Sequence, residues 1–147
     1  MPKQEVPKPS LLWLFFSPFG RISRAPYWLA FGFTWCILFI AFNVTSHMVI
    51  DVYTANGSLD IPLEMFVNDM FAANPLLAPM VFASKFTELM LVMKRLQDRG
   101  LTSFIALLIF LPFVNFLIVF AAGFLKSQPG PNKYGPYSNT RPLPRKK

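Results

Sequence analysis

The chain has 147 residues, of which 54% are hydrophobic and only 14% are charged, whereas about 25% of residues are charged in a typical soluble domain. This balance excludes an ordinary soluble fold and indicates a chain in contact with lipid. The net charge of +7 does not indicate nucleic-acid binding, because the basic residues fall in short clusters at the ends of long apolar runs.

Residues 1–26 form a basic N-terminal region that contains one apolar segment, SLLWLFFSPFG, over residues 10–20. This segment is about half as long as the roughly 20 residues that cross a bilayer, so we expect it to lie at the membrane interface. No small-residue cleavage site follows it, so we do not expect removal as a signal peptide.

The first predicted membrane span covers residues 27–50 and contains no formal charge at neutral pH. It begins with Tyr27 and Trp28, whose rings are typical of the aromatic belt at a membrane surface. Its length and composition predict a transmembrane helix.

The loop over residues 51–75 carries acidic residues and no basic residue. Part of it has the periodicity of an amphipathic surface helix, which we expect to continue into the next span through a break at Asn74 and Pro75. The apolar positions that recur at helical spacing are Leu63, Phe66, Val67, Met70 and Phe71.

The second predicted span covers residues 76–93 and contains the opposite charges of Lys85 and Glu88. Because an unpaired charge near the bilayer centre costs about 2.5 to 3.5 kcal/mol, both should face protein or water. They stand at i and i+3 on one helical face and can form an ion pair. Three interpretations are open: a structural pair that faces neighbouring helices, a contact with a partner subunit, and a proton or ion relay.

The third predicted span covers residues 101–125, which are uncharged, and Pro112 near its middle predicts a kink. The tail over residues 126–147 is basic and rich in proline, and its composition cannot build a hydrophobic core of its own.

The positions of the basic residues predict a cytoplasmic N-terminus and an acidic loop on the outer side. With three full spans, the basic tail would then emerge on the outer side, against the same rule. Either the tail pairs with the acidic loop or an acidic partner, or Pro112 and Asn115 mark a re-entrant turn that returns it to the cytoplasm. Because halves of about 12 residues are short for membrane segments, we favour three spans.

The sequence offers little support for an enzyme. His47 is the only histidine and Cys36 the only cysteine, so neither a disulfide within the chain nor a histidine or cysteine metal cluster is expected. No nucleophile, paired carboxylate or phosphate-binding loop is present in a recognisable pattern. We therefore predict no catalytic, cofactor-binding or metal-binding residues.

Three short motifs lie in order along the chain: FSPFGRISRAPYW at 16–28, KRLQDRGLTS at 94–103 and PGPNKYGPY at 129–137. Together they resemble the small bacterial inner-membrane proteins grouped as domain of unknown function 805 (DUF805), and the resemblance covers most of the chain. The family motif has histidine where this chain has Gln97, and arginine where it has Lys94. The positions that match the family are Gly20, Arg21, Arg24, Tyr27, Trp28, Arg95, Leu96, Asp98, Gly100, Asn132, Tyr134 and Gly135.

The resemblance implies an integral protein of the bacterial inner membrane and supplies no established activity. Physical chemistry suggests roles for the first motif: Arg21 and Arg24, followed by Tyr27 and Trp28, are expected to anchor the first span at lipid headgroups or at a partner.

The second motif is expected to lock the turn after the second span. Arg95 and Asp98 stand at i and i+3 and can form a salt bridge, and Gly100 can end the helix. The third motif contributes the tail residues Asn132, Tyr134 and Gly135.

The sequence thus predicts an all-α integral membrane protein with three transmembrane helices and short interfacial helices. We expect a non-catalytic accessory or structural subunit that packs against a larger membrane complex, with the bilayer, anionic lipid headgroups and other integral membrane subunits as its partners. The alternative is a small homo-oligomeric transporter or channel that uses Lys85 and Glu88.

Overall fold

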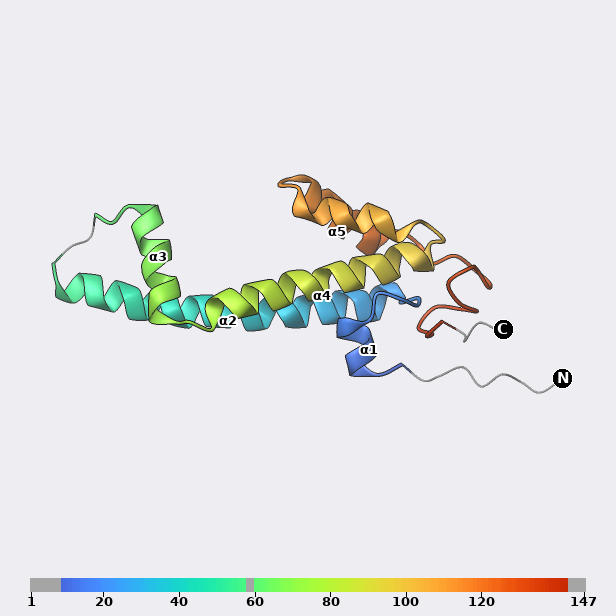
Figure 1. Cartoon of the computed structure of the whole chain (residues 1–147), viewed down its shortest axis with the longest axis horizontal. Coiled ribbons are helices and arrows are strands. Elements are labelled where there is room, and N and C mark those ends of the chain that lie inside the picture. The colour runs from blue at the N-terminus through green and yellow to red at the C-terminus, as the bar shows by residue number, and fades with distance from the viewer. Residues whose placement is uncertain (1–8, 58–59, 143–147) are drawn as a thin grey trace. The chain divides into compact units, whose positions relative to one another are not determined.

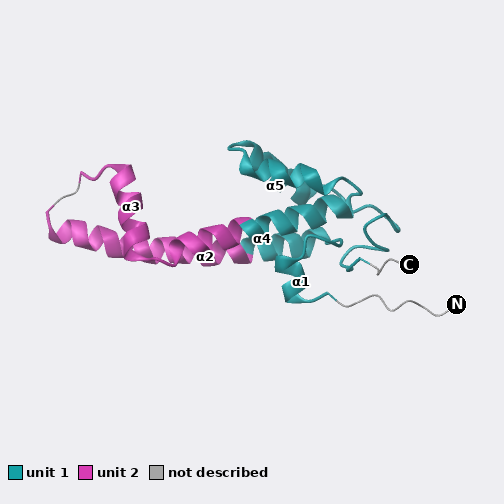
Figure 2. Ribbon diagram, in the orientation of Figure 1, with its two compact units in different colours: residues 1–32, 86–147 teal, residues 33–85 magenta. Residues whose placement is uncertain are grey.

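The computed structural model describes residues 9–57 and 60–142. Within these ranges the chain is helical and contains no strand, although two isolated β-bridges join pairs of residues. The chain forms two compact units, residues 1–32 with 86–147 and residues 33–85 (Figure 2). The elements in chain order are α1 (Leu11–Phe16), α2 (Arg24–Ala55), α3 (Leu63–Ala73), α4 (Leu77–Asp98), the 3-10 helix η1 (Ser103–Phe110) and α5 (Val114–Phe124) (Figure 1).

The apolar segment predicted over 10–20 forms α1, a helix of six residues, followed by irregular backbone. Ser10 is its N-cap, and the Ser10 Oγ accepts a hydrogen bond of 3.2 Å from the Trp13 N–H, which satisfies one of the free donors at the helix start. Trp13 is the buried residue of this helix. It fixes α1 to the core of the first unit.

The helix predicted over 27–50 is present as α2 and extends further at both ends, to 32 residues. It is long and apolar enough to cross a bilayer. The pair α3 and α4 meets the same criterion if it is counted as one broken span, bent by 96° between Ala73 and Leu77. These apolar helices indicate a membrane protein.

The amphipathic helix predicted in the acidic loop is present as α3. Met70 on this helix is buried and packs with Val49 and Leu77, and Phe66 is half-buried beside them. Polar contacts hold the same elements: the Asn74 Nδ2 donates to the Thr45 Oγ1 at 3.0 Å, and the Tyr53 hydroxyl donates to an Asp69 carboxylate oxygen. This small core folds α3 back on the C-terminal part of α2, and the chain breaks at Asn74 and Pro75 as predicted.

The single helix predicted over 101–125 is not formed. The segment instead divides into η1 and α5, which lie side by side as a helical hairpin in the first unit. The break has a local cause, because Pro112 lacks an N–H and restricts the preceding residue to extended backbone, as Leu111 adopts with ψ 126°. Phe113 then completes the reversal with φ of 64°. At about 2.0 Å per 3-10 residue and 1.5 Å per α residue, each arm is roughly 16 Å long, or about half of a 30 Å hydrocarbon core.

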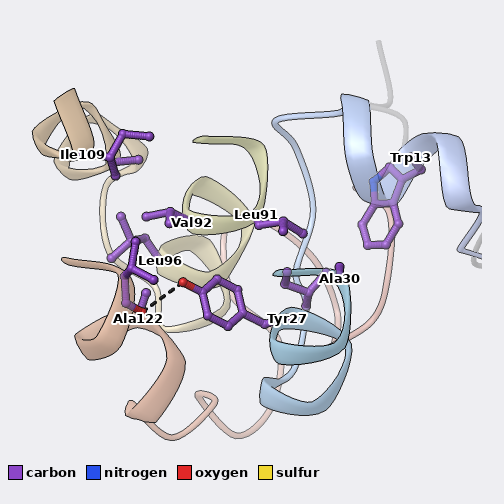
Figure 3. Packing of buried hydrophobic residues seen from close by; sticks show 11 residues of the cluster. Trp13, Tyr27, Ala30, Leu91, Val92, Leu96, Ile109 and Ala122 are labelled. Carbon is purple, nitrogen blue, oxygen red and sulfur yellow. Dashed lines mark hydrogen bonds between the residues drawn. The ribbon is translucent and has the colours of Figure 1, made fainter. Parts of the chain in front are cut away.

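The core of the first unit joins the start of α2, the end of α4 and both arms of the hairpin (Figure 3). Tyr27 is fully buried in it, and the Tyr27 hydroxyl donates to the Val119 carbonyl of α5 at 2.9 Å. Leu91 and Leu96 of α4 pack in the same cluster. The remaining buried members are Trp13, Ile22, Ala30, Val92, Ala106, Ile109, Val119 and Ala122.

Trp28 makes the second contact between α2 and α5. Its ring lies 5.8 Å from that of Phe120 and 5.6 Å from that of Phe124. Gly123 lies under the indole, so that a Cβ at this position would overlap the Trp28 ring atoms. A glycine is therefore needed where the hairpin docks on α2.

We predict that Gly123→Ala destabilises the protein by roughly 1–3 kcal/mol, because the added methyl group overpacks the contact with Trp28. Gly32→Ala is the matched control. No atom lies within 4 Å of the Cβ that it would add, and alanine is favoured over glycine in a helix by about 0.5–1 kcal/mol. Thermal unfolding followed by circular dichroism in a mild detergent measures both effects. A Gly123→Ala protein that melts at or above the wild-type temperature would contradict the docking contact.

Candidate functional site

The three sequence motifs meet in the first unit, where they form a buried polar cluster at the end of α4. Arg21 follows the irregular segment after α1, Asp98 ends α4, and residues 127–140 come from the tail. We call this arrangement the motif cluster; its charged members are Arg21, Arg95 and Asp98. None of these three side chains is more than 1% exposed.

The Arg21 guanidinium binds the tail through backbone carbonyls. Its Nη1 donates to the carbonyls of Gly130 at 2.8 Å and Gly135 at 3.0 Å, and its Nη2 donates to the Gln128 carbonyl at 2.7 Å. Its Nε donates to the Asp98 Oδ1 at 3.1 Å. The planar fork of donors thus positions three separate tail carbonyls around one side chain.

The backbone around Arg21 also pairs with the tail. The Arg21 N–H donates to the Thr140 carbonyl at 3.0 Å, and the Thr140 N–H donates to the Arg21 carbonyl at 3.2 Å. Gly20 precedes this bridge with φ of 119°, and a Cβ there would lie 2.6 Å from the Trp13 ring and 2.8 Å from the Thr140 carbonyl oxygen. Only glycine fits both the conformation and the space.

Asp98 is the acceptor that joins the motifs. Its carboxylate accepts from Arg21, from the Arg95 Nη1 at 2.5 Å and from the Ser138 hydroxyl at 2.5 Å. Its backbone carbonyl accepts from the Gln128 N–H at 3.1 Å. Asp98 therefore contacts two buried guanidinium groups and two points on the tail.

Arg95 holds the turn after α4 against the base of the hairpin. Its guanidinium donates to the carbonyls of Ile22 and Leu125 and to the Ser127 hydroxyl. Its Nε–H is buried with no hydrogen-bond partner among the described residues. The Arg95 and Asp98 pair predicted at i and i+3 is present as an ion pair, and Gly100 follows with φ of 80°.

Lys94 and Gln97 attach the N-terminal segment to the end of α4. The Lys94 Nζ donates to the carbonyls of Trp13 and Leu14 in α1 and lies 4.8 Å from the centre of the Trp13 ring. Gln97 accepts from the Gly20 N–H at 3.0 Å and donates to the Pro18 carbonyl at 2.9 Å and to the Ser103 hydroxyl at 2.6 Å.

An open cavity of about 720 Å³ lies beside Gln97. The tail motif forms much of its wall, and Lys133 is the charged side chain that lines it. The Asn132 side chain shapes this wall: its Nδ2 donates to the Gln97 carbonyl at 3.0 Å, and its Oδ1 accepts from the Tyr134 N–H at 2.9 Å. The other lining residues are Phe19, Gly20, Pro131, Tyr134, Gly135, Pro136 and Pro142.

The residues predicted to anchor the first span lie in different places. Arg24 is exposed, whereas Arg21 is fully buried and does not reach a headgroup, because Asp98 and the tail carbonyls occupy its donors. Tyr27 and Trp28 face the hairpin, where Val119 and α5 fix them, and do not form an exposed aromatic belt.

Lys85 is half-buried and Glu88 is buried, three residues apart on α4. Neither side chain is without an interaction partner. Their pairing with one another stays a prediction.

Sequence reasoning missed Lys94, Ser138 and Thr140 as members of the cluster. A signal was present, because the motifs place charged side chains beside glycines, and glycines mark close approaches of the backbone. In the described part of the chain, no group of three or more histidine, cysteine, aspartate or glutamate side chains could hold a metal ion.

Comparison with known proteins identifies a family. A family model described as "Protein of unknown function (DUF805)" matches residues 15–136, which include the first two motifs and the third up to Pro136. No curated protein and no solved structure matches the chain.

We predict that Arg21→Lys releases the tail while it keeps the charge. Lysine cannot reproduce the fork that binds three carbonyls, and loss of one charge-assisted hydrogen bond of about 1.5–3 kcal/mol raises the population of a locally opened tail by about tenfold or more. The rate of trypsin cleavage after Lys133 in detergent measures this opening.

Arg24→Lys is the matched control, since it makes the same substitution at an exposed arginine three residues away. Its cleavage rate after Lys133 should equal that of the wild type. Equal rates for Arg21→Lys and wild type would mean that Arg21 does not hold the tail.

Proposed function

The chain belongs to the DUF805 family, and we propose that it is a non-catalytic, polytopic protein of the bacterial inner membrane that serves as an accessory or structural subunit of a larger membrane complex. The observation that carries this proposal is the direction of the motif side chains. Arg21, Arg95 and Asp98 point inward and are at most 1% exposed. A group that acts on a substrate must reach it, whereas these charges bind one another and the backbone.

The exposed surface of α2 supports a role within the membrane. Large apolar side chains cover the part of this helix that the first predicted span includes, and such a surface requires lipid or a neighbouring membrane subunit. Those that are at least 43% exposed include Leu29, Phe33, Trp35, Ile37, Phe39, Ile40, Val44, Met48 and Ile50.

For the topology we propose two spans and a re-entrant hairpin, in place of three spans. The hairpin begins and ends at the same point: the Arg99 Nη1 donates to the Lys126 carbonyl at 3.1 Å, and the Gln128 N–H donates to the Asp98 carbonyl at 3.1 Å. The tail then lies on the cytoplasmic side with the N-terminus. This arrangement removes the conflict between the basic tail and the positive-inside rule.

We predict that the tail and the N-terminal segment are labelled from the same side of the membrane. In a Cys36→Ala background, Asn56→Cys reports the acidic loop, Tyr137→Cys the tail and Phe19→Cys the N-terminal segment; all three positions are exposed. A membrane-impermeant maleimide should label Asn56→Cys in intact spheroplasts and the other two only after lysis. Labelling of Tyr137→Cys, but not of Phe19→Cys, in intact spheroplasts would restore the three-span topology.

We further predict that the full-length tagged protein, extracted from its native membrane in a mild detergent, elutes at a fixed molar ratio with a defined membrane complex. Size-exclusion chromatography and quantitative mass spectrometry measure this ratio. Recovery as a monomer or homo-oligomer alone would contradict the accessory role.

Recovery as a homo-oligomer would make the transporter or channel alternative the next hypothesis to test. Its test is flux into proteoliposomes with Lys85→Leu, which removes the half-buried charge of α4, against Lys133→Leu, which removes an exposed charge on the tail. Loss of flux in the first variant alone would favour that alternative.

A further inference from the structure

The exposed charges of the first unit are all positive among its described residues. Arg24, Arg99, Lys126 and Lys133 are exposed and Arg141 is half-buried. The acidic side chains described in this unit, Glu88 and Asp98, are both buried, at 4% and 0% exposed. Among the described residues of this unit, the surface cations therefore have no exposed carboxylate nearby.

Three of these cations stand on backbone segments that meet at the base of the hairpin. The Arg99 guanidinium donates to the Lys126 carbonyl at 3.1 Å, which brings these two residues together. The Arg95 guanidinium donates to the carbonyls of Ile22, two residues before Arg24, and of Leu125, one residue before Lys126, and so joins their two segments. We call Arg24, Arg99 and Lys126 the stem cations.

Buried charge adds to the positive field at this point. Arg24 lies close enough to Arg95 for the two charges to repel one another. Within the motif cluster, Asp98 is the carboxylate that accepts from two guanidinium groups, those of Arg21 and Arg95. One positive charge of the cluster is thus left over beside the stem cations.

The apolar surface next to the stem cations suits acyl chains. Phe124 is 68% exposed, and Phe120, whose ring lies 6.2 Å from that of Phe124, is 50% exposed. Leu101, two residues after Arg99, is also exposed. Cationic side chains that border exposed aromatic side chains are typical of the boundary between headgroups and hydrocarbon.

We infer that the stem cations bind the phosphate of an anionic phospholipid, whose acyl chains lie against the exposed aromatic side chains of α5. Opposite charge supplies the attraction, and the adjoining apolar surface selects a lipid over a free anion. The inference rests on the membrane location proposed above and not on a partner complex.

The test uses the purified full-length protein in a neutral detergent and native mass spectrometry. The probes are phosphatidylglycerol and phosphatidylcholine with the same acyl chains. The wild type should retain phosphatidylglycerol preferentially. Lys126→Gln should weaken its binding roughly fivefold, and a double substitution with Arg24→Gln roughly 25-fold, because each cation near an anionic membrane surface contributes about that factor.

Lys126→Gln should leave the fold intact, because Arg99 donates to the backbone carbonyl of residue 126, which the substitution does not remove. Lys133→Gln is the matched control, because it removes an equal charge from an exposed position on the tail. The affinity of this variant for phosphatidylglycerol should stay within about twofold of that of the wild type, since Lys133 is not one of the stem cations.

Three results would overturn the inference: equal retention of the two lipids, an equal loss in Lys133→Gln, or displacement of phosphatidylglycerol by millimolar sodium phosphate. The last would assign the stem cations to a free anion. Because no other protein is present, failure of this test leaves the accessory-subunit proposal standing, and failure of co-elution leaves the lipid site standing.

Discussion

The ion cluster of Arg21, Asp98 and Arg95 is the constraint on which the first unit depends. Two guanidinium groups and one carboxylate lie buried together, and burial of charge is favourable only when hydrogen bonds replace the lost water. Tail carbonyls and hydroxyls supply those bonds. Removal of one charged side chain leaves its partner buried without compensation, which costs about 3–5 kcal/mol in comparable ion pairs. The cluster therefore couples the N-terminal segment, the end of α4 and the tail into one structure.

The hairpin makes this cluster possible. The tail reaches Arg21 only because residues 101–125 return to the end of α4, and that return depends on the extended backbone before Pro112 and the positive φ of Phe113. Tyr27 and Trp28 then fix the returning arm through Val119 and Gly123. An uncharged stretch of membrane-spanning length thus ends beside the residues where it began, and the described part of the tail is held by donors from elsewhere in the chain.

Local patterns in the sequence predict the local structure well. The spacing of Leu63, Phe66 and Met70 predicts α3, the apolar run predicts α2, and the i and i+3 spacing predicts the pairing of Arg95 with Asp98. The same patterns offer a turn at Pro112 and Asn115 only as an alternative, because halves of about 12 residues are short for membrane segments and apolar length favours a full span. They also misplace Arg21: an arginine before an apolar helix is typical of a headgroup anchor, and its real partners are 77 to 114 residues away in the chain. Contacts at that separation are set by tertiary structure and leave no periodic signal.

Gln97, in the second motif, has a structural role in this chain. Its amide makes three bonds at once, as acceptor from the Gly20 N–H and as donor to the Pro18 carbonyl and the Ser103 hydroxyl. A neutral imidazole at this position, where the family motif has histidine, has one donor and one acceptor and would lose one of the three bonds. A protonated imidazole would have two donors and would lose the acceptor for Gly20. An amide also carries no titratable proton, so in this chain the position joins the segment after α1 to α4 and η1 without acid–base chemistry. Gln97 therefore acts as the buried charged residues of the motifs do: its polar atoms hold backbone segments together.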